Sequence, residues 1–492
     1  MALSVAIWLA SGVVISLLTF LALNKSQKEV VLRRLGLSRR NASRPSTPLL
    51  EKQPLSKPSS STLDLYATLP PSQRGQLSTI AEKMSPDQKE ALGNLSFDMD
   101  TFARSLLGFE EDYRTADDSK YCFSGFSVRE LKALGDFPDY SVISEVPMPQ
   151  PYPEFDIDRA KPRPYRPFRW AYHQTMSLTK LETDWWIELE STYKTRIAQR
   201  KELYATHGKS VLNWLPGSEL ACKELMEMVL QFICARYPQY FILSPDKSQL
   251  ENKILGTVSI IKEKHPLLIL LDNVPEDFNI MLRDPETGYY HLRAGMTCSS
   301  LGWNLGTKMG LRLDDIHTPI PDYKEKMQFS MDRYFSKMPA SKPIQRGSWG
   351  LEVDQPLYMP PGDPHESYRD AQDPNVSRSR IHLRVDWQTL RRLPLSAGVV
   401  FNFKALFTPI EEMRDEPYVP SLLLKVLKEG KENLMKYKNT WHTEHVVIPT
   451  LEEFEKEQIE KGIVEKDWEP RTLDDSPWFP GWQEKWHAQQ GF

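Results

Sequence analysis

Two segments late in the chain place apolar residues at every second position, and this alternation constrains the fold more than any other feature. Residues 381–387 place Ile, Leu, Val and Trp at every second position, and residues 399–405 do the same with Val, Phe, Phe and Ala. Successive side chains of a β-strand point to opposite faces, so the pattern is typical of strands with one buried face. We therefore predict two antiparallel strands that pack through one face on a hydrophobic layer.

Helices and further strands are predicted around these two segments. Apolar residues recur at helical spacing from Ser218 to Pro238, and another helix is predicted over residues 420–438. The turn-forming residues 284–288 separate two strand-like segments and indicate a β-hairpin, and the apolar run 267–271 is predicted as a short buried strand. Strands and helices in separate runs predict an α+β fold with an antiparallel sheet and surrounding helices.

The first 24 residues contain no charged side chain and are mostly apolar. About 20 apolar residues are enough to span the hydrocarbon core of a membrane. Six basic residues and one acid, Glu29, follow within residues 25–40, and the positive-inside rule places the chain after such a flank in the cytosol. We predict an uncleaved, single-pass anchor with the bulk of the chain in the cytosol.

Composition divides the chain into five segments. Prolines with Tyr and Phe between them crowd residues 146–168, which predicts an extended strap packed on the core, and the tryptophans near the C-terminus predict a tail that packs on its own domain. The predicted segments are a transmembrane anchor over 1–24, a basic then Pro/Ser-rich linker over 25–75, a helical segment with the Pro-rich strap over 76–165, a compact domain over 166–440 and a Trp-rich extension over 441–492.

Charge and motif content exclude several functions. The formal net charge is −4, and the chain outside the basic residues 25–40 is more acidic still, which argues against a nucleic-acid partner. The sequence contains no dinucleotide-binding, Walker A or nucleophile-elbow motif. Its four dispersed cysteines cannot form a CxxC pair or a four-cysteine metal site. The segment His442-Thr-Glu-His445 is one residue short of a zinc motif and predicts two solvent-facing histidines.

Four stretches, taken together in order and spacing, resemble one protein family. The most specific are residues 316–321 (Ile-His-Thr-Pro-Ile-Pro) and 388–394 (Gln-Thr-Leu-Arg-Arg-Leu-Pro), and residues 167–190 and 215–238 hold the other two. They are similar to the α-subunit of haem-dependent oxidative N-demethylase and to its relatives, which include fungal HRQ-family proteins. The resemblance covers residues 166–440.

The resemblance implies a PAS-like domain that cradles haem b. It implies oxidation of a small N-methyl amine by O2 with release of formaldehyde, and it implies a redox partner, because the flavin and iron–sulfur cluster of the demethylase lie on other subunits. Electrons would then come from an external flavin or iron–sulfur reductase. Two other functions are also compatible with the sequence. The chain could be a haem-binding sensor without catalysis or a haem-free interaction scaffold. The family pattern commonly has Glu-Arg where this chain has Asp386-Trp387, which leaves the substrate open.

The resemblance also implies a set of site residues. Haem iron takes an axial ligand, commonly a neutral imidazole, and His317 is the predicted ligand because the prolines after it restrict the backbone. His382 and Cys298 are the alternative ligands, and Tyr323 is predicted to donate a hydrogen bond on the distal side. Arginines match the haem propionates, and the predicted ones are Arg346, Arg384, Arg391 and Arg392.

Overall fold

The computed structural model of the chain describes residues 79–80, 82, 84–86, 89, 105–173 and 175–491. The predicted anchor over 1–24 and the predicted linker over 25–75 therefore lie outside the described residues. Among the helices of the described part, none is long and apolar enough to cross a membrane.

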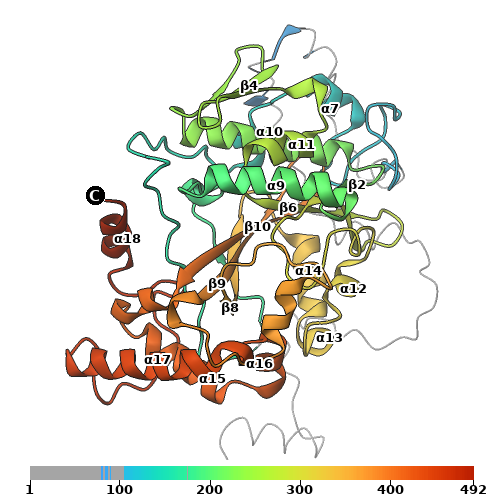
Figure 1. Cartoon of the computed structure of the whole chain (residues 1–492). Helices are drawn as coiled ribbons and strands as arrows, with labels where there is room; N and C mark the ends of the chain where they lie inside the picture. Colours follow the sequence, from blue (N-terminus) through green and yellow to red (C-terminus); the bar gives the residue numbers. More distant parts are fainter. Residues whose placement is uncertain are drawn as a thin grey trace, which may run out of the picture. The chain divides into compact units, whose positions relative to one another are not determined.

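A seven-strand sheet, antiparallel throughout, forms the centre of the described part (Figure 1). A separate three-strand sheet has the order β3-β4-β5, with β3 at Phe241–Leu243, β4 at Gln249–Asn252 and β5 at Thr257–Ile260. The large sheet confirms the predicted α+β class. Its strands, in spatial order, are β1 (Thr179–Lys180), β8 (Ile344–Val353), β9 (Ile381–Arg392), β10 (Val399–Pro409), β6 (Asp277–Arg283), β7 (Tyr290–Met296) and β2 (Leu212–Trp214).

Helices cover both faces of the large sheet (Figure 1). One apolar cluster joins one face to α10, α11, α15 and α17, and a second joins the other face to α12, α13 and α14. The helices are α7 (Val128–Leu134), α8 (Tyr140–Ser144), α9 (Tyr193–His207), α10 (Glu219–Arg236), α11 (Pro266–Asn273), α12 (Leu313–His317), α13 (Tyr323–Lys326), α14 (Gln328–Lys337), α15 (Val419–Glu429), α16 (Glu432–Lys438), α17 (Trp441–Glu460) and α18 (Trp482–Gln490).

The two alternating segments pair as predicted, but the expectation of one buried face per strand is wrong for both strands. In β10 the polar residues Asn402 and Lys404 are buried, whereas Phe401 and Phe403 of the predicted buried face are only half-buried. The β9–β10 ladder runs from the pair Arg392–Val399 to the pair His382–Pro409. The polar positions His382 and Arg384 are buried as well as the apolar ones. The reason is that α12–α14 and the long connections around them cover the face that the alternation assigned to solvent.

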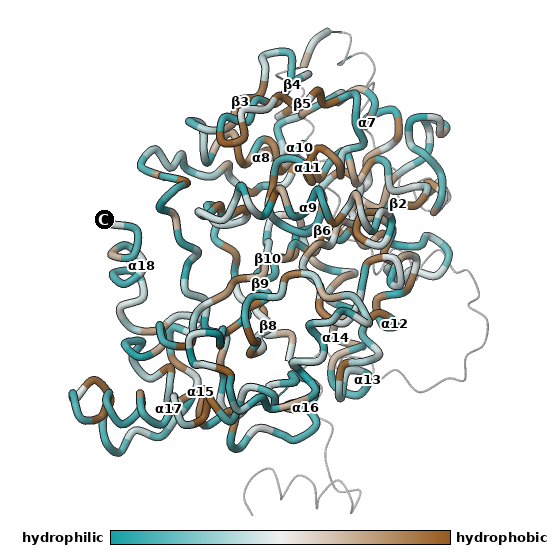
Figure 2. Tube along the Cα trace, viewed as in Figure 1, coloured by the Kyte–Doolittle hydropathy of each residue, from teal (hydrophilic) through white to brown (hydrophobic). Residues whose placement is uncertain are grey.

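Two of the predicted elements differ in the structure. Residues 267–271 are part of helix α11, which Figure 2 colours as strongly hydrophobic, and not a strand. Pro266 occupies the first turn and the His265 side chain accepts a hydrogen bond from the Leu267 amide, so this start is helical. The predicted helix over 420–438 is two helices, α15 and α16, which are interrupted at Gly430. The predicted hairpin is confirmed as β6–β7, and the helix after Ser218 as α10.

The Pro-rich strap and the Trp-rich tail pack on the core and on each other. Phe155, Tyr165 and Phe168 of the strap are buried. The indole of Trp486 donates a hydrogen bond to the Lys161 carbonyl at 2.8 Å, and Trp478 packs edge-on against Tyr165 at 5.3 Å. The tail thus holds the strap against the sheet, since aromatic side chains are costly to leave in water.

A buried ion pair ties the strap to the segment before α15. The Arg166 guanidinium donates two hydrogen bonds, each 2.7 Å long, to the Glu416 carboxylate, and both side chains are almost fully buried. We expect Arg166→Ala to lower the free energy of unfolding by about 3 kcal/mol, because Glu416 loses its bidentate partner in the interior. Urea denaturation of the purified protein measures this change. Arg114→Ala, which removes an exposed pair with Asp112, is the control and should cost less than about 1 kcal/mol; equal effects would contradict the prediction.

Candidate functional site

Three neighbouring central strands share a patch of half-buried residues on one face. Arg346 of β8 lies directly opposite Gln388 of β9, which lies opposite Phe403 of β10. Residues that are directly opposite in an antiparallel sheet point to the same face. Ser348 and Asp386 form the next opposed pair. The patch consists of Arg346, Ser348, Asp386, Gln388, Phe401 and Phe403, all half-buried, and we call it the sheet-face patch.

The aromatic part of the sheet-face patch is ordered by stacking. Phe401 stacks on Phe403 with ring centroids 5.8 Å apart, and on Phe335 of α14 with centroids 5.7 Å apart. On the same face, Leu390 and Val399 are fully covered by the cluster that includes α12–α14. The half-buried phenylalanines therefore form an apolar floor at the point where this helical cover stops.

His317 ends helix α12 on the same face and is held in one orientation. Its Nδ1 lies 2.6 Å from the Leu313 carbonyl, and its ring stacks on Tyr323 at 5.1 Å with an interplanar angle of 13°. Burial lowers the pKa of His317 to about 4, so the imidazole is neutral near pH 7. A neutral ring that donates from Nδ1 carries its lone pair on Nε2, and no described residue hydrogen-bonds to Nε2. This is the state that a metal ligand requires.

Tyr323 lies beside His317 at the start of α13. Its side chain is buried, and its hydroxyl has no hydrogen-bond partner among the described residues. Burial raises the pKa of Tyr323 well above its ordinary value, so the phenol stays protonated. It is thus an unused hydrogen-bond donor next to the His317 ring.

Arg346 is the cation of the sheet-face patch. Its guanidinium makes no hydrogen bond or ion pair with the described residues, and its Nε is buried. Burial lowers the pKa of Arg346, and the tyrosines 165, 172 and 437 partly offset this effect. The Arg346 charge also contributes to the lowered pKa of His317. An unpaired guanidinium of this kind is ready to receive an anion.

The other three predicted arginines have different surroundings. Arg384 donates to the Pro356 carbonyl at 2.7 Å and to Asp386 at 3.0 Å, and also to the Ser299 carbonyl. Arg392 donates to the carbonyls of Phe335, Met338 and Ala397. Both arginines therefore fix loops and helix ends in place.

Arg391 follows the opposite parity on β9 and faces the other side of the sheet. Its guanidinium lies 4.1 Å from the centre of the Trp186 ring, and burial lowers its pKa to about 10. Of the four predicted arginines in the described structure, only Arg346 both acts on His317 and lacks a partner for its charge.

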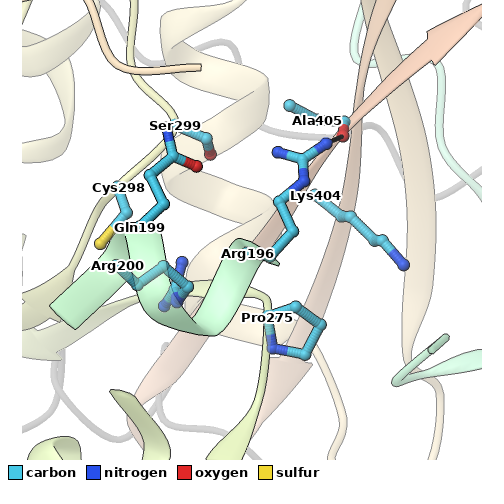
Figure 3. Close-up of a pocket in the computed structure, with 8 residues that line it drawn as sticks. All are labelled: Arg196, Gln199, Arg200, Pro275, Cys298, Ser299, Lys404 and Ala405. Carbon is cyan, nitrogen blue, oxygen red and sulfur yellow. Dashed lines mark hydrogen bonds between the residues drawn. The ribbon is translucent and has the colours of Figure 1, made fainter. Parts of the chain in front are cut away.

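Neither alternative ligand is free to bind a metal, because His382 uses both ring nitrogens in hydrogen bonds and Cys298 is protonated. The His382 Nδ1 lies near the Arg380 carbonyl at 3.1 Å, and its Nε2 lies near the Gln355 amide at 3.2 Å. Cys298 lines a small pocket with Arg196, Arg200 and Lys404 (Figure 3). Burial raises the pKa of Cys298 to about 12, so it is a thiol and not a thiolate.

The prediction of two solvent-facing histidines in α17 is wrong for His442. That residue is buried, with Nδ1 at 2.9 Å from the Asn439 carbonyl, and His445 is half-buried with Nε2 at 2.9 Å from the Asp373 carbonyl. Among the residues that the structure describes, no group of three or more His, Cys, Asp or Glu side chains is arranged to hold a metal ion. A metal held mainly by a macrocycle requires only one such ligand.

Sequence reasoning missed the aromatic floor and the contact of Lys438 with strand β8. Phe401 and Phe403 belong to the apolar face of an alternating strand, so they were expected to be covered. The pairing of the strands could have indicated the exposure of Phe403, because Phe403 lies opposite Gln388, which itself lies opposite Arg346 on the next strand. Lys438, at the end of α16, lies 4.3 Å from the centre of the Trp349 ring of β8, and nothing in its local sequence indicates this contact.

One family model matches this chain, over residues 177–448, which is more than half of its length. Its description is "Haem-dependent oxidative N-demethylase, alpha subunit-like". The match begins next to β1 and ends inside α17, so it contains the whole described seven-strand sheet and helices α12–α14.

The neutral state of His317 has a measurable pH signature in the protein without bound cofactor. The unfolded chain takes up a proton at this histidine near pH 6.5, whereas the folded protein does so only near pH 4. Acid between these values therefore favours the unfolded state, by at most about 1.4 kcal/mol per pH unit. We expect the loss of stability between pH 7 and pH 5 to be smaller in His317→Gln than in the parent, as measured by urea denaturation. An unchanged pH profile would show that His317 titrates normally.

Proposed function

The chain belongs to the haem-dependent oxidative N-demethylase alpha-subunit-like family, and we propose that it is a haem-dependent oxidase of a small N-methyl amine. The observation that supports this most directly is His317. It is a neutral, oriented imidazole with a free Nε2 beside an unpaired guanidinium and an apolar aromatic floor.

The residues present fit haem b in their chemistry. The Nδ1 contact of His317 with a backbone carbonyl is the usual outer-sphere partner of a ligating histidine. Phe401 and Phe403 offer an apolar surface for the macrocycle, and the unpaired Arg346 offers a partner for a propionate. We propose His317 as the axial ligand in a PAS-like cradle that is formed by the antiparallel sheet.

Bound haem would supply the reductive activation of O2. The overall reaction converts the N-methyl amine, O2, two electrons and two protons into the demethylated amine, formaldehyde and water. In this proposal, the protonated phenol of Tyr323 donates a hydrogen bond within the site, since burial holds its pKa high. Asp386, half-buried and bound through Oδ1 to Arg384, leaves Oδ2 to accept from an ammonium group.

The two electrons would come from a separate flavin or iron–sulfur reductase. The four cysteines at 122, 222, 234 and 298 are dispersed in sequence, and among the described residues no three of them gather with each other or with His, Asp or Glu to hold a metal. We further propose that residues 1–24 anchor the chain in the endoplasmic reticulum membrane, with the oxidase facing the cytosol, so that a membrane-bound reductase reaches it by lateral diffusion.

Absorption spectroscopy of the full chain, expressed with a haem precursor, tests the cofactor and its ligand together. We expect a Soret band in the parent that is lost or shifted in His317→Ala, because that change removes the axial nitrogen. His382→Gln and Cys298→Ser are matched controls and should keep the parent spectrum, since His382 has no free nitrogen and Cys298 is protonated.

Each of the other outcomes would support a different ligand or a different function. A band that is unchanged in His317→Ala but lost in either control would move the ligand to that residue. A band with ligand binding but without formaldehyde release from N-methyl amines, in the presence of flavoprotein or iron–sulfur reductases, would make the chain a haem sensor. A folded protein without a band would overturn the oxidase proposal and leave an interaction scaffold.

A further inference from the structure

We propose that Arg346 and Lys438 together form a receptor for paired carboxylates, which binds the two propionates of haem. This inference rests on the proposed function, and it assigns a role to helix α16 that the sequence did not indicate.

Strand β8 has an edge that is only partly paired. In the described sheet, β1 pairs with Ile344 and Gln345 and leaves the rest of that edge of β8 unpaired by a strand. The end of α16 lies there. Lys438 donates a hydrogen bond from Nζ to the Trp349 carbonyl at 2.8 Å, and a Cβ atom added to Gly350 would lie 3.8 Å from the Lys438 carbonyl. Lys438 is therefore fixed within a few residues of Arg346 along the same strand.

Helix α16 is also tied to the helices that position His317. Lys431, before the first residue of α16, forms a 2.6 Å ion pair with Asp322, which precedes α13. Figure 1 shows α16 next to α13 and beside β8. The His317–Tyr323 stack and Lys438 thus border the same part of the sheet from two sides.

The two cations have no counter-ion of their own. Neither Arg346 nor Lys438 forms an ion pair with any residue that the structure describes. Asp386, the carboxylate that acts on Lys438, is already bound to Arg384 at 2.9 Å. The lysine ammonium instead lies over the rings of Trp349 at 4.3 Å and Tyr172 at 5.4 Å, and this leaves N–H donors free beyond the one used by the Trp349 carbonyl.

This arrangement is costly without an anion. Burial, and then the charge of Arg346, lower the pKa of Lys438 to about 7. Two like charges that are partly removed from water and lack a partner favour any ligand that neutralises both. Haem b carries two propionates, so its charge matches the pair. A carboxylate on the amine substrate has the same chemistry, and the experiment separates these two sources.

Titration of the full chain with ferric haem b and with its dimethyl ester measures the contribution of the carboxylates. We expect the parent to bind haem b at least about tenfold more tightly than the ester, which corresponds to one charge-assisted contact. Arg346→Met and Lys438→Met should each reduce this preference, and the double variant should abolish it. Lys438→Arg should keep the preference for haem b that Lys438→Met loses, which would show that the loss comes from the missing charge and not from misfolding.

Matched controls come from exposed cations on α16 and on α14. Lys436→Met on α16 and Arg333→Met on α14 remove charges of exposed residues and should keep the parent preference. If haem b and the ester bind equally to every form, the second arm compares N,N-dimethylglycine with dimethylamine as spectral perturbants of the haem protein. A preference for the carboxylated amine that disappears in Lys438→Met or Arg346→Met would assign the receptor to the substrate; equal binding in both arms would overturn the receptor.

The pH dependence of binding is a second readout. The charged and titratable groups that face Lys438 are Arg346, Asp386 and Tyr172, and Tyr437 acts on Arg346 and Asp386. Above about pH 7 the free lysine loses its proton, so binding of a carboxylate must take one up, and the affinity for haem b should fall as the pH rises. Lys438→Met should not show this fall, and the same profile in both proteins would contradict the proposal. A protein that binds neither haem form at any pH would instead overturn the proposed function.

Discussion

The antiparallel pairing of β9 with β10 is the interaction on which the rest of the structure depends. The ladder spans eleven residue pairs, from Arg392–Val399 to His382–Pro409, and it lies in the middle of the sheet, so every other strand is added outward from it. Because its two faces must both be covered, helices from before and after it in the sequence converge on the same sheet. The half-buried positions on β8, β9 and β10 mark the place where that cover is incomplete.

Buried arginines on this ladder hold the cover in position. Arg392 binds the carbonyls at the end of α14, and Arg384 binds the carbonyls of two connecting segments. Each satisfies backbone oxygens that would otherwise be buried without donors, which is costly. The same residue type at Arg346 has no such partner, and the contrast separates a structural role from a binding role within one sheet.

Much of the fold could be predicted from the sequence, since periodicity reports local structure well. The β6–β7 hairpin, the β9–β10 pair and helix α10 all followed from it. The apolar run 267–271 could not be assigned, because five consecutive apolar residues have no period, and the helical start at Pro266 decides the outcome. For the site, His317 and Tyr323 could be selected from the sequence. The missing partner of Arg346 and the hydrogen bonds of Arg384 and Arg392 to backbone carbonyls could not be predicted from it. Those depend on long-range contacts that no local pattern encodes.

The contact between strap and tail has a consequence for synthesis of the chain. The carbonyls of Lys161 and Gly491 bind partners from the opposite segment, Trp486 and Arg159. The strap emerges from the ribosome more than three hundred residues before these partners exist. During translation the tyrosines and phenylalanines of the strap therefore lack part of their cover until residues 478–491 have been synthesised and have left the ribosome. A ribosome that stalls before residue 478 would therefore leave the strap without this cover and exposed to chaperones.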